Sequence, residues 1–94
     1  MSYCRTTIVE FNSEELADEA AADYSKNASY EFPEDEILLF THTGPTSAVV
    51  ASVYPSEEIS EQATVARNAR MDKAAYRRKS AEVDQGDVIL NLVR

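Results

Sequence analysis

Few side chains in this sequence have the chemistry of a catalytic site, and their spacing defines no particular reaction. His42 is the only histidine and Cys4 the only cysteine, so neither a thiolate metal site nor a cluster of imidazoles can form. The sequence therefore predicts no metal ion and no cofactor. His42 could act as a general base or a hydrogen-bond donor. The simpler interpretation is a surface histidine near the end of a strand.

Three further residues place a polar group among aliphatic and aromatic neighbours: Tyr54, Tyr76 and Asn91. Together with His42 they are the candidate ligand-binding residues, because a few polar groups in an apolar wall are typical of small-molecule pockets. A filled hydrophobic core can have the same composition. The sequence leaves both interpretations open.

Basic residues gather in one segment, since six of the nine lysines and arginines lie between Arg67 and Lys79. Arg70, Lys73 and Arg77 would share one helix face, where they could bind a carboxylate or a phosphate. The alternative is that they compensate the helix dipole and form salt bridges. Few acids lie four residues away along the helix, so the partners should come from the acids of the first helix: Glu15, Asp18, Glu19 and Asp23.

Length and composition predict one globular domain spanning residues 1–94, with 44% hydrophobic and 28% charged residues. The formal charge of −8 argues against nucleic acid and against anionic membrane surfaces as partners. Residues 1–5 lack the layout of a signal peptide, so a cytoplasmic protein is expected. The uncharged stretch Ile37–Ser56 is interrupted by Gly44-Pro45, which indicates a hairpin and not a membrane span.

The first half of the chain predicts a strand, a helix and a hairpin. Cys4–Phe11 is rich in β-branched residues, and Asn12 with Glu15 could form the capping box of a following alanine-rich helix. Ile37–Thr43 and Ser47–Tyr54 would form the hairpin. The acidic run of residues 34–36 between helix and hairpin is interpreted as a solvated loop.

The second half predicts a helix that starts after a Ser56 cap and runs to about Ser80. Its apolar stripe shifts around the helix axis, which indicates either a break near Asn68–Met71 or two faces with different partners. Residues 84–87 would end this region, and Val88–Val93 would form the last strand.

This order of elements is the split βαβ, or ferredoxin-like, arrangement: an α+β fold in which a four-stranded antiparallel sheet carries two helices on one face. Both faces of the predicted strands are apolar, whereas a sheet with one wet face alternates apolar and polar residues. The second face therefore needs a cover, and a second copy of the chain is the simplest one.

The element order and the two-sided strands resemble the dimeric α+β barrel superfamily, which includes the antibiotic-biosynthesis monooxygenases. The stretch Val53-Tyr54-Pro55-Ser56-Glu57-Glu58, an aromatic strand end that leads into an acid-capped helix, is similar to the junction after their third strand. The resemblance implies a homodimer whose sheets close face to face. It also implies a cavity, around which those monooxygenases typically use Trp, Asn and His or Tyr.

Three functions remain open at this point. The main hypothesis is a dimer that binds a small hydrophobic or carboxylate-bearing molecule without catalysis. The first alternative is a cofactor-independent monooxygenase or isomerase acting on a small organic substrate. The second alternative is a purely structural dimeric assembly module.

Overall fold

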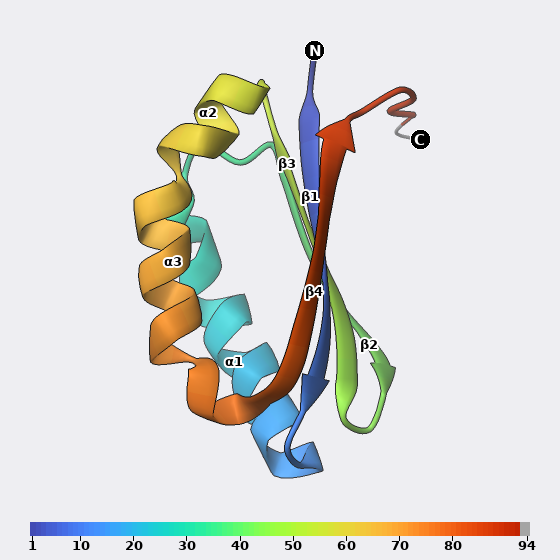
Figure 1. Cartoon of the computed structure of the whole chain (residues 1–94), viewed down its shortest axis with the longest axis vertical. Coiled ribbons are helices and arrows are strands. Elements are labelled where there is room, and N and C mark those ends of the chain that lie inside the picture. Colours follow the sequence, from blue (N-terminus) through green and yellow to red (C-terminus); the bar gives the residue numbers. More distant parts are fainter. Residues whose placement is uncertain (93–94) are drawn as a thin grey trace.

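The computed structural model describes residues 1–92, and it has the ferredoxin-like fold that the element order predicts (Figure 1). One antiparallel sheet has the strand order β2-β3-β1-β4, made of β1 (Tyr3–Phe11), β2 (Ile37–Gly44), β3 (Ser47–Tyr54) and β4 (Arg78–Asp87). One face carries the helices α1 (Glu14–Glu31), α2 (Glu57–Gln62) and α3 (Thr64–Lys73), and a 3₁₀ turn (Ala75–Arg77) leads into β4. The predicted fold class is therefore confirmed. No helix within residues 1–92 is long and apolar enough to cross a membrane.

Helix α1 begins one residue later than the capping box predicts. Ser13 is the N-cap, and its Oγ accepts a hydrogen bond from the backbone N–H of Leu16 at 3.2 Å. Asn12 points elsewhere, because its side-chain amide donates to the carbonyl oxygen of Tyr76 at 3.1 Å. The capping box of Asn12 and Glu15 was therefore wrong, since a contact distant in sequence occupies Asn12.

The second helical region breaks earlier than predicted. Ser56 caps α2 as expected, but the break falls at Ala63 and not near Asn68–Met71. Ala63 is 3% exposed and packs against Phe32 and Tyr54. The chain changes direction at this contact, which fixes the start of α3, and α3 ends at Lys73 instead of near Ser80.

The last strand differs most from its predicted position. The prediction of a strand over Val88–Val93 was wrong, because β4 spans Arg78–Asp87 and pairs with β1 from Phe11 to Tyr3. The other edge of β1 is already paired with β3, so its free edge takes the first segment after α3. Glu82 and Asp84 on this edge strand suit a position that must not pair with further chains. The apolar residues of the predicted strand are exposed instead, at Ile89, Leu90 and Leu92; Val93 lies outside the described residues.

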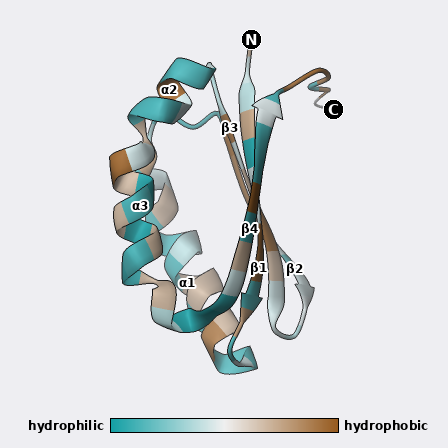
Figure 2. Cartoon of the chain, in the orientation of Figure 1, coloured by the Kyte–Doolittle hydropathy of each residue, from teal (hydrophilic) through white to brown (hydrophobic). Residues whose placement is uncertain are grey.

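The two faces of the sheet differ in their cover. Alternate residues such as Val9, Ala48 and Tyr54 point toward the helices and are buried. Within residues 1–92 no helix lies over the opposite face (Figures 1 and 2). On this open face, Ile8 and Leu39 are 49% and 55% exposed. By the strand register, the apolar residues of this open face are Cys4, Ile8, Ile37, Leu39, Val49, Ala51 and Val53.

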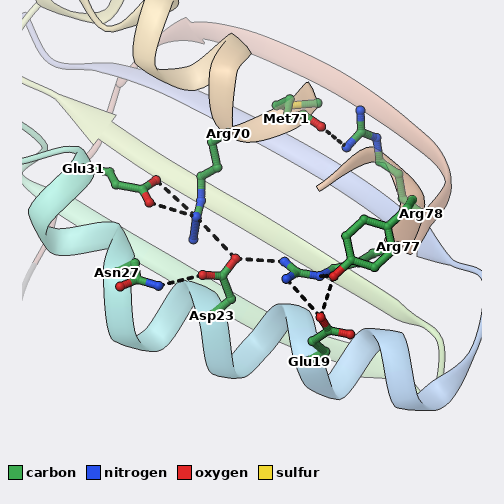
Figure 3. A network of polar contacts seen from close by, with 9 residues as sticks. Glu19, Asp23, Asn27, Glu31, Arg70, Met71, Arg77 and Arg78 are labelled. Carbon is green, nitrogen blue, oxygen red and sulfur yellow. Dashed lines mark hydrogen bonds and ion pairs between the residues drawn. The ribbon is translucent and has the colours of Figure 1, made fainter. Parts of the chain in front are cut away.

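Charged side chains join α3 and the following turn to α1 (Figure 3). Asp23 accepts a hydrogen bond from Arg77 at 2.8 Å and pairs with Arg70 at 3.5 Å. Glu31 pairs with Arg70 at 3.1 Å, and Glu19 pairs with Arg77 at 3.3 Å. The prediction that these arginines face acids of the first helix is confirmed for Arg70 and Arg77 through Asp23 and Glu19. Glu31 is an additional partner, and Glu15 and Asp18 form no ion pair within residues 1–92. Lys73 is exposed and forms no ion pair within residues 1–92.

These contacts carry more weight than ordinary surface ion pairs, because α3 has no buried residue with which to pack. The side chains of Arg70 and Arg77 are only 15% and 13% exposed. Hydrogen bonds from Arg77 and from Asn27 lower the pKa of Asp23 below its ordinary value of 3.8. Electrostatic pairing therefore replaces part of the hydrophobic packing that usually fixes a helix on its sheet.

We expect Arg77→Gln to lower the free energy of unfolding by about 1–2 kcal/mol, since it breaks charge-assisted hydrogen bonds at a partly buried site. The loss should shrink at high salt, measured by urea denaturation. It should also shrink as the pH falls below about 4, because a carboxylate with a depressed pKa stabilises the fold only while it is ionised.

The exposed Lys73→Gln is the matched control, since it removes one positive charge from the same region without breaking an ion pair. Equal losses for the two variants would contradict a specific role of the Arg77 contacts.

Candidate ligand-binding pocket

A cavity of ≈ 140 Å³ lies between the helix-covered face of the sheet and the helices α1 and α3. Its apolar wall includes Val9, Phe11, Phe32, Phe40, Val50 and Met71. The alanine stripe of α1 packs closely on the sheet, with Ala17 and Ala20 buried, whereas α3 places arginines over the sheet. Two separate core clusters result, and residues of both line the cavity between them.

Among residues 1–92, five arginines line this mostly apolar cavity: Arg5, Arg67, Arg70, Arg77 and Arg78. Arg70 and Arg77 are neutralised by the acids of α1. Arg78 donates to the carbonyl oxygen of Met71 at 2.7 Å. Within residues 1–92, no carboxylate forms an ion pair with Arg5, Arg67 or Arg78. These three arginines therefore bring positive charge to the pocket that no ion pair within residues 1–92 neutralises.

Arg5 is the most unusual of these residues, because it sits on β1 in phase with the buried Val9 and Phe11. Burial lowers the pKa of Arg5 below its ordinary value, and the nearby positive charge of Arg67 lowers it further. Two neighbouring arginines without an acid between them are favourable for an incoming anion.

Arg67 reaches the pocket from α3 and is held by neutral partners. Its Nη1 donates to the hydroxyl of Tyr54 at 3.3 Å and to the carbonyl oxygen of Ser60 at 3.2 Å, and its Nη2 donates to the hydroxyl of Thr64 at 3.2 Å. Its Nε is buried and has no hydrogen-bond partner within residues 1–92. These contacts orient the guanidinium group without neutralising it.

Asp35 lies next to this end of the pocket, in the loop between α1 and β2. Both of its carboxyl oxygens are buried, so the interpretation of residues 34–36 as a solvated loop was wrong for Asp35. Burial raises the pKa of Asp35 to about 7; the charge of Glu34 adds to the rise, and Arg67 opposes it. Because its pKa lies near 7, the carboxyl group of Asp35 can exchange a proton near neutral pH. Burial also raises the pKa of Tyr24, whose ring lines the cavity.

The four candidate ligand-binding residues do not meet at one site. Tyr54 lines the cavity and is 1% exposed. His42 is exposed on the edge strand β2, with its ring centroid 5.6 Å from that of Phe40, and it borders a separate shallow hollow beside α1. Tyr76 is 57% exposed, and its hydroxyl donates to Glu19. Asn91 is exposed and lies outside the sheet. Of the four, Tyr54 alone contributes to this cavity.

Sequence reasoning missed Arg5, which lines the pocket, and the buried Asp35, on whose carboxyl group the charge of Arg67 acts. A signal for Arg5 was present, because its position in the strand alternates with the core residues Val9 and Phe11 and a charge in that phase is unusual. Arg67 belonged to the recognised basic cluster, although its place in the cavity was not predicted. No comparable signal marks Asp35, whose burial depends on how its loop packs.

No protein-family model matches this chain, and no curated protein is similar to it in sequence. Solved structures are similar in fold. A dimeric ferredoxin-like protein from an uncultured marine organism has a TM-score of 0.78 at 9% identity, covering 99% of this chain and 92% of that chain. A monooxygenase of Streptomyces coelicolor, in complex with the ligand nanaomycin D, has a TM-score of 0.78 at 8% identity with the same coverage. A Mycobacterium tuberculosis protein also has a TM-score of 0.78, at 6% identity and 99% and 100% coverage. At these identities the comparison shows the fold, and the chain shares the ferredoxin-like α+β fold of these proteins.

Proposed function

We propose that this protein binds a small, largely apolar molecule with one anionic oxygen in the cavity between sheet and helices. The observation that carries the proposal is the pair Arg5 and Arg67, which face an apolar cavity without an acidic partner among residues 1–92. A buried charge normally requires a partner, and a ligand carboxylate or phenolate would supply it.

The size of the cavity limits the ligand. A cavity of ≈ 140 Å³ is close to the size of about 150 Å³ that accepts benzene in an engineered protein. A single aromatic ring therefore fits against Phe32, Phe40 and Val50, with its charged group toward Arg5 and Arg67. A larger ligand would extend through the open side of the pocket.

Benzoate and benzamide test this proposal, because they share a ring and a shape but only benzoate is charged at neutral pH. We expect benzoate to bind more tightly in an NMR titration of the protein. Arg67→Gln should weaken benzoate binding by about tenfold, the typical effect of losing a charge-assisted hydrogen bond. The same variant should leave benzamide binding within about twofold.

Lys73→Gln is the control, since Lys73 is exposed on the same helix and does not line the cavity. Equal affinity of the wild-type protein for benzoate and benzamide would show that the arginines do not hold an anion.

Cofactor-independent oxygenation is a second candidate function. It is favoured by the shared fold with a monooxygenase and by the unpaired arginines, which would stabilise the phenolate of a hydroquinone. In such a reaction hydroquinone and O₂ yield hydroxybenzoquinone and water, so one oxygen atom enters the ring and the other leaves as water.

An oxygen electrode with hydroquinone as the probe tests this second function. We expect oxygen uptake above the uncatalysed rate, with one atom of ¹⁸O₂ retained in the product, and a reduced rate for Arg67→Gln. Benzoate binding without any oxygen uptake would support ligand binding alone and contradict the oxygenase.

For the assembly we propose a homodimer in which a second copy covers the open face of the sheet. The apolar residues of the open face come from β1, β2 and β3, and Leu39 on the edge strand β2 is 55% exposed. Apolar patches of this kind mark interaction surfaces. The similar marine protein is described as dimeric, which supports the same arrangement here.

Sedimentation at micromolar concentration should therefore give about twice the chain mass of 10.5 kDa. Leu39→Asp should shift the protein toward the monomer, because it places a charge in the buried interface. Val65→Asp is the matched control, since Val65 is 82% exposed on α3 and away from the open face. A wild-type monomer, or dissociation by both variants alike, would contradict this interface.

A further inference from the structure

Within residues 1–92, three buried side-chain polar atoms lack a hydrogen-bond partner: both carboxyl oxygens of Asp35 and Nε of Arg67. Folded proteins leave few such atoms unpaired. Arg67 lines the pocket. Asp35 does not line it, but its carboxyl group lies close enough for the charge of Arg67 to act on it. This concentration of unpaired groups in two residues points to a joint role in ligand binding.

The backbone holds Asp35 in position. Its N–H donates to the carbonyl oxygen of Phe32 at 3.2 Å, and the N–H of Glu36 donates to the carbonyl oxygen of Val53 at 2.7 Å. These bonds place the Asp35 backbone beside the end of β3, and both carboxyl oxygens are buried there.

The groups that act on the Asp35 carboxyl come from every neighbouring element. Ser52 lies beside it on β3, Tyr24 on α1 and Glu34 in its own loop, and Arg67 on α3 is the positive charge that acts on it. Arg67 does not form an ion pair with Asp35, because three neutral groups bind its Nη1 and Nη2. The two charges therefore influence each other without direct contact.

We propose that Asp35 takes up a proton when an anion binds beside Arg67, so that the pocket binds anions more tightly at pH 6 than at pH 8. The inference rests on the proposed function, because it requires an anion in the cavity.

The physical reason is competition for one positive charge. An ionised Asp35 and a bound anion would both be attracted to Arg67, and they would repel each other in a poorly solvated space. Protonation removes this repulsion: a proton from the buffer forms an O–H bond on the Asp35 carboxyl, and the ligand's negative charge takes its place near Arg67. The net charge of the site then stays the same on binding.

The pH range follows from the state of Asp35 before binding. With its pKa raised to about 7, the group is protonated at pH 6 and largely ionised at pH 8. If the bound anion raises this pKa by one further unit, linkage predicts roughly fivefold tighter binding at pH 6 than at pH 8. It also predicts uptake of roughly 0.4 proton per anion at pH 7.

Isothermal titration calorimetry with benzoate tests the inference. Titrations at pH 7 in two buffers with different ionisation enthalpies give the number of protons taken up, and titrations at pH 6 and pH 8 give the affinities. Asp35→Asn should abolish both the uptake and the pH dependence, and it should bind benzoate at pH 8 as tightly as the wild type binds it at pH 6.

His42→Gln is the control, since His42 is exposed and does not line the cavity; it should keep the wild-type proton uptake. Glu34→Gln should instead shift the pH dependence to lower pH, because the charge of Glu34 contributes to the raised pKa of Asp35. The inference is overturned if benzoate binds the wild type without proton uptake, or if Asp35→Asn keeps the full pH dependence. The wild-type measurement decides even if the Asp35 variant does not fold. Failure of benzoate to bind at any pH would instead contradict the proposed function, and the coupling with it.

Discussion

The position of α3 depends on the carboxylate of Asp23, which pairs with both Arg70 and Arg77. These two pairs connect α3 and the turn after it to α1. Most ferredoxin-like domains would fix a helix by packing aliphatic side chains on the sheet. Here α3 buries no residue. Its distance from the sheet is set by long, charged side chains that reach under it, and Tyr24 supports Arg70 from below with its ring 5.3 Å away.

The cavity results from the use of arginines, and not of aliphatic side chains, between α3 and the sheet. Aliphatic residues on α3 would fill the space between the two core clusters, whereas arginines span it and leave room beside them. The same side chains then give the space its chemical character. Arg70 and Arg77 form ion pairs with α1, whereas Arg5 and Arg67 form no ion pair within residues 1–92 and are the residues proposed to meet a ligand. The arginines of the pocket thus differ in their ion-pair partners.

Asp35 makes the proposed ligand binding depend on pH, since its carboxyl group can place a negative charge near Arg67, to which the proposed ligand would also bind. A permanently ionised carboxylate at this place would oppose anion binding. A carboxyl group whose pKa burial raises to about 7 can give way by protonation. Binding and proton uptake would then depend on the same buried space, which is why the proposed coupling follows from the geometry of the pocket and the loop together.

The sequence by itself determined the elements whose residue types indicate whether each position is buried or exposed. The strands β1, β2 and β3 were predictable because their β-branched and aromatic residues match a sheet that is apolar on both faces. The attraction of Arg70 and Arg77 to the acids of α1 followed from charge alone. Only the tertiary structure decided β4, because its polar residues pair with β1 through backbone groups that any sequence has, while the more apolar Ile89 and Leu90 stay exposed. The site divides in the same way. Tyr54 was a candidate because of its residue type and its sequence neighbours. The burial of Asp35 and the proximity of Arg5 to Arg67 depend on contacts between segments far apart in the chain, and no local pattern encodes such contacts.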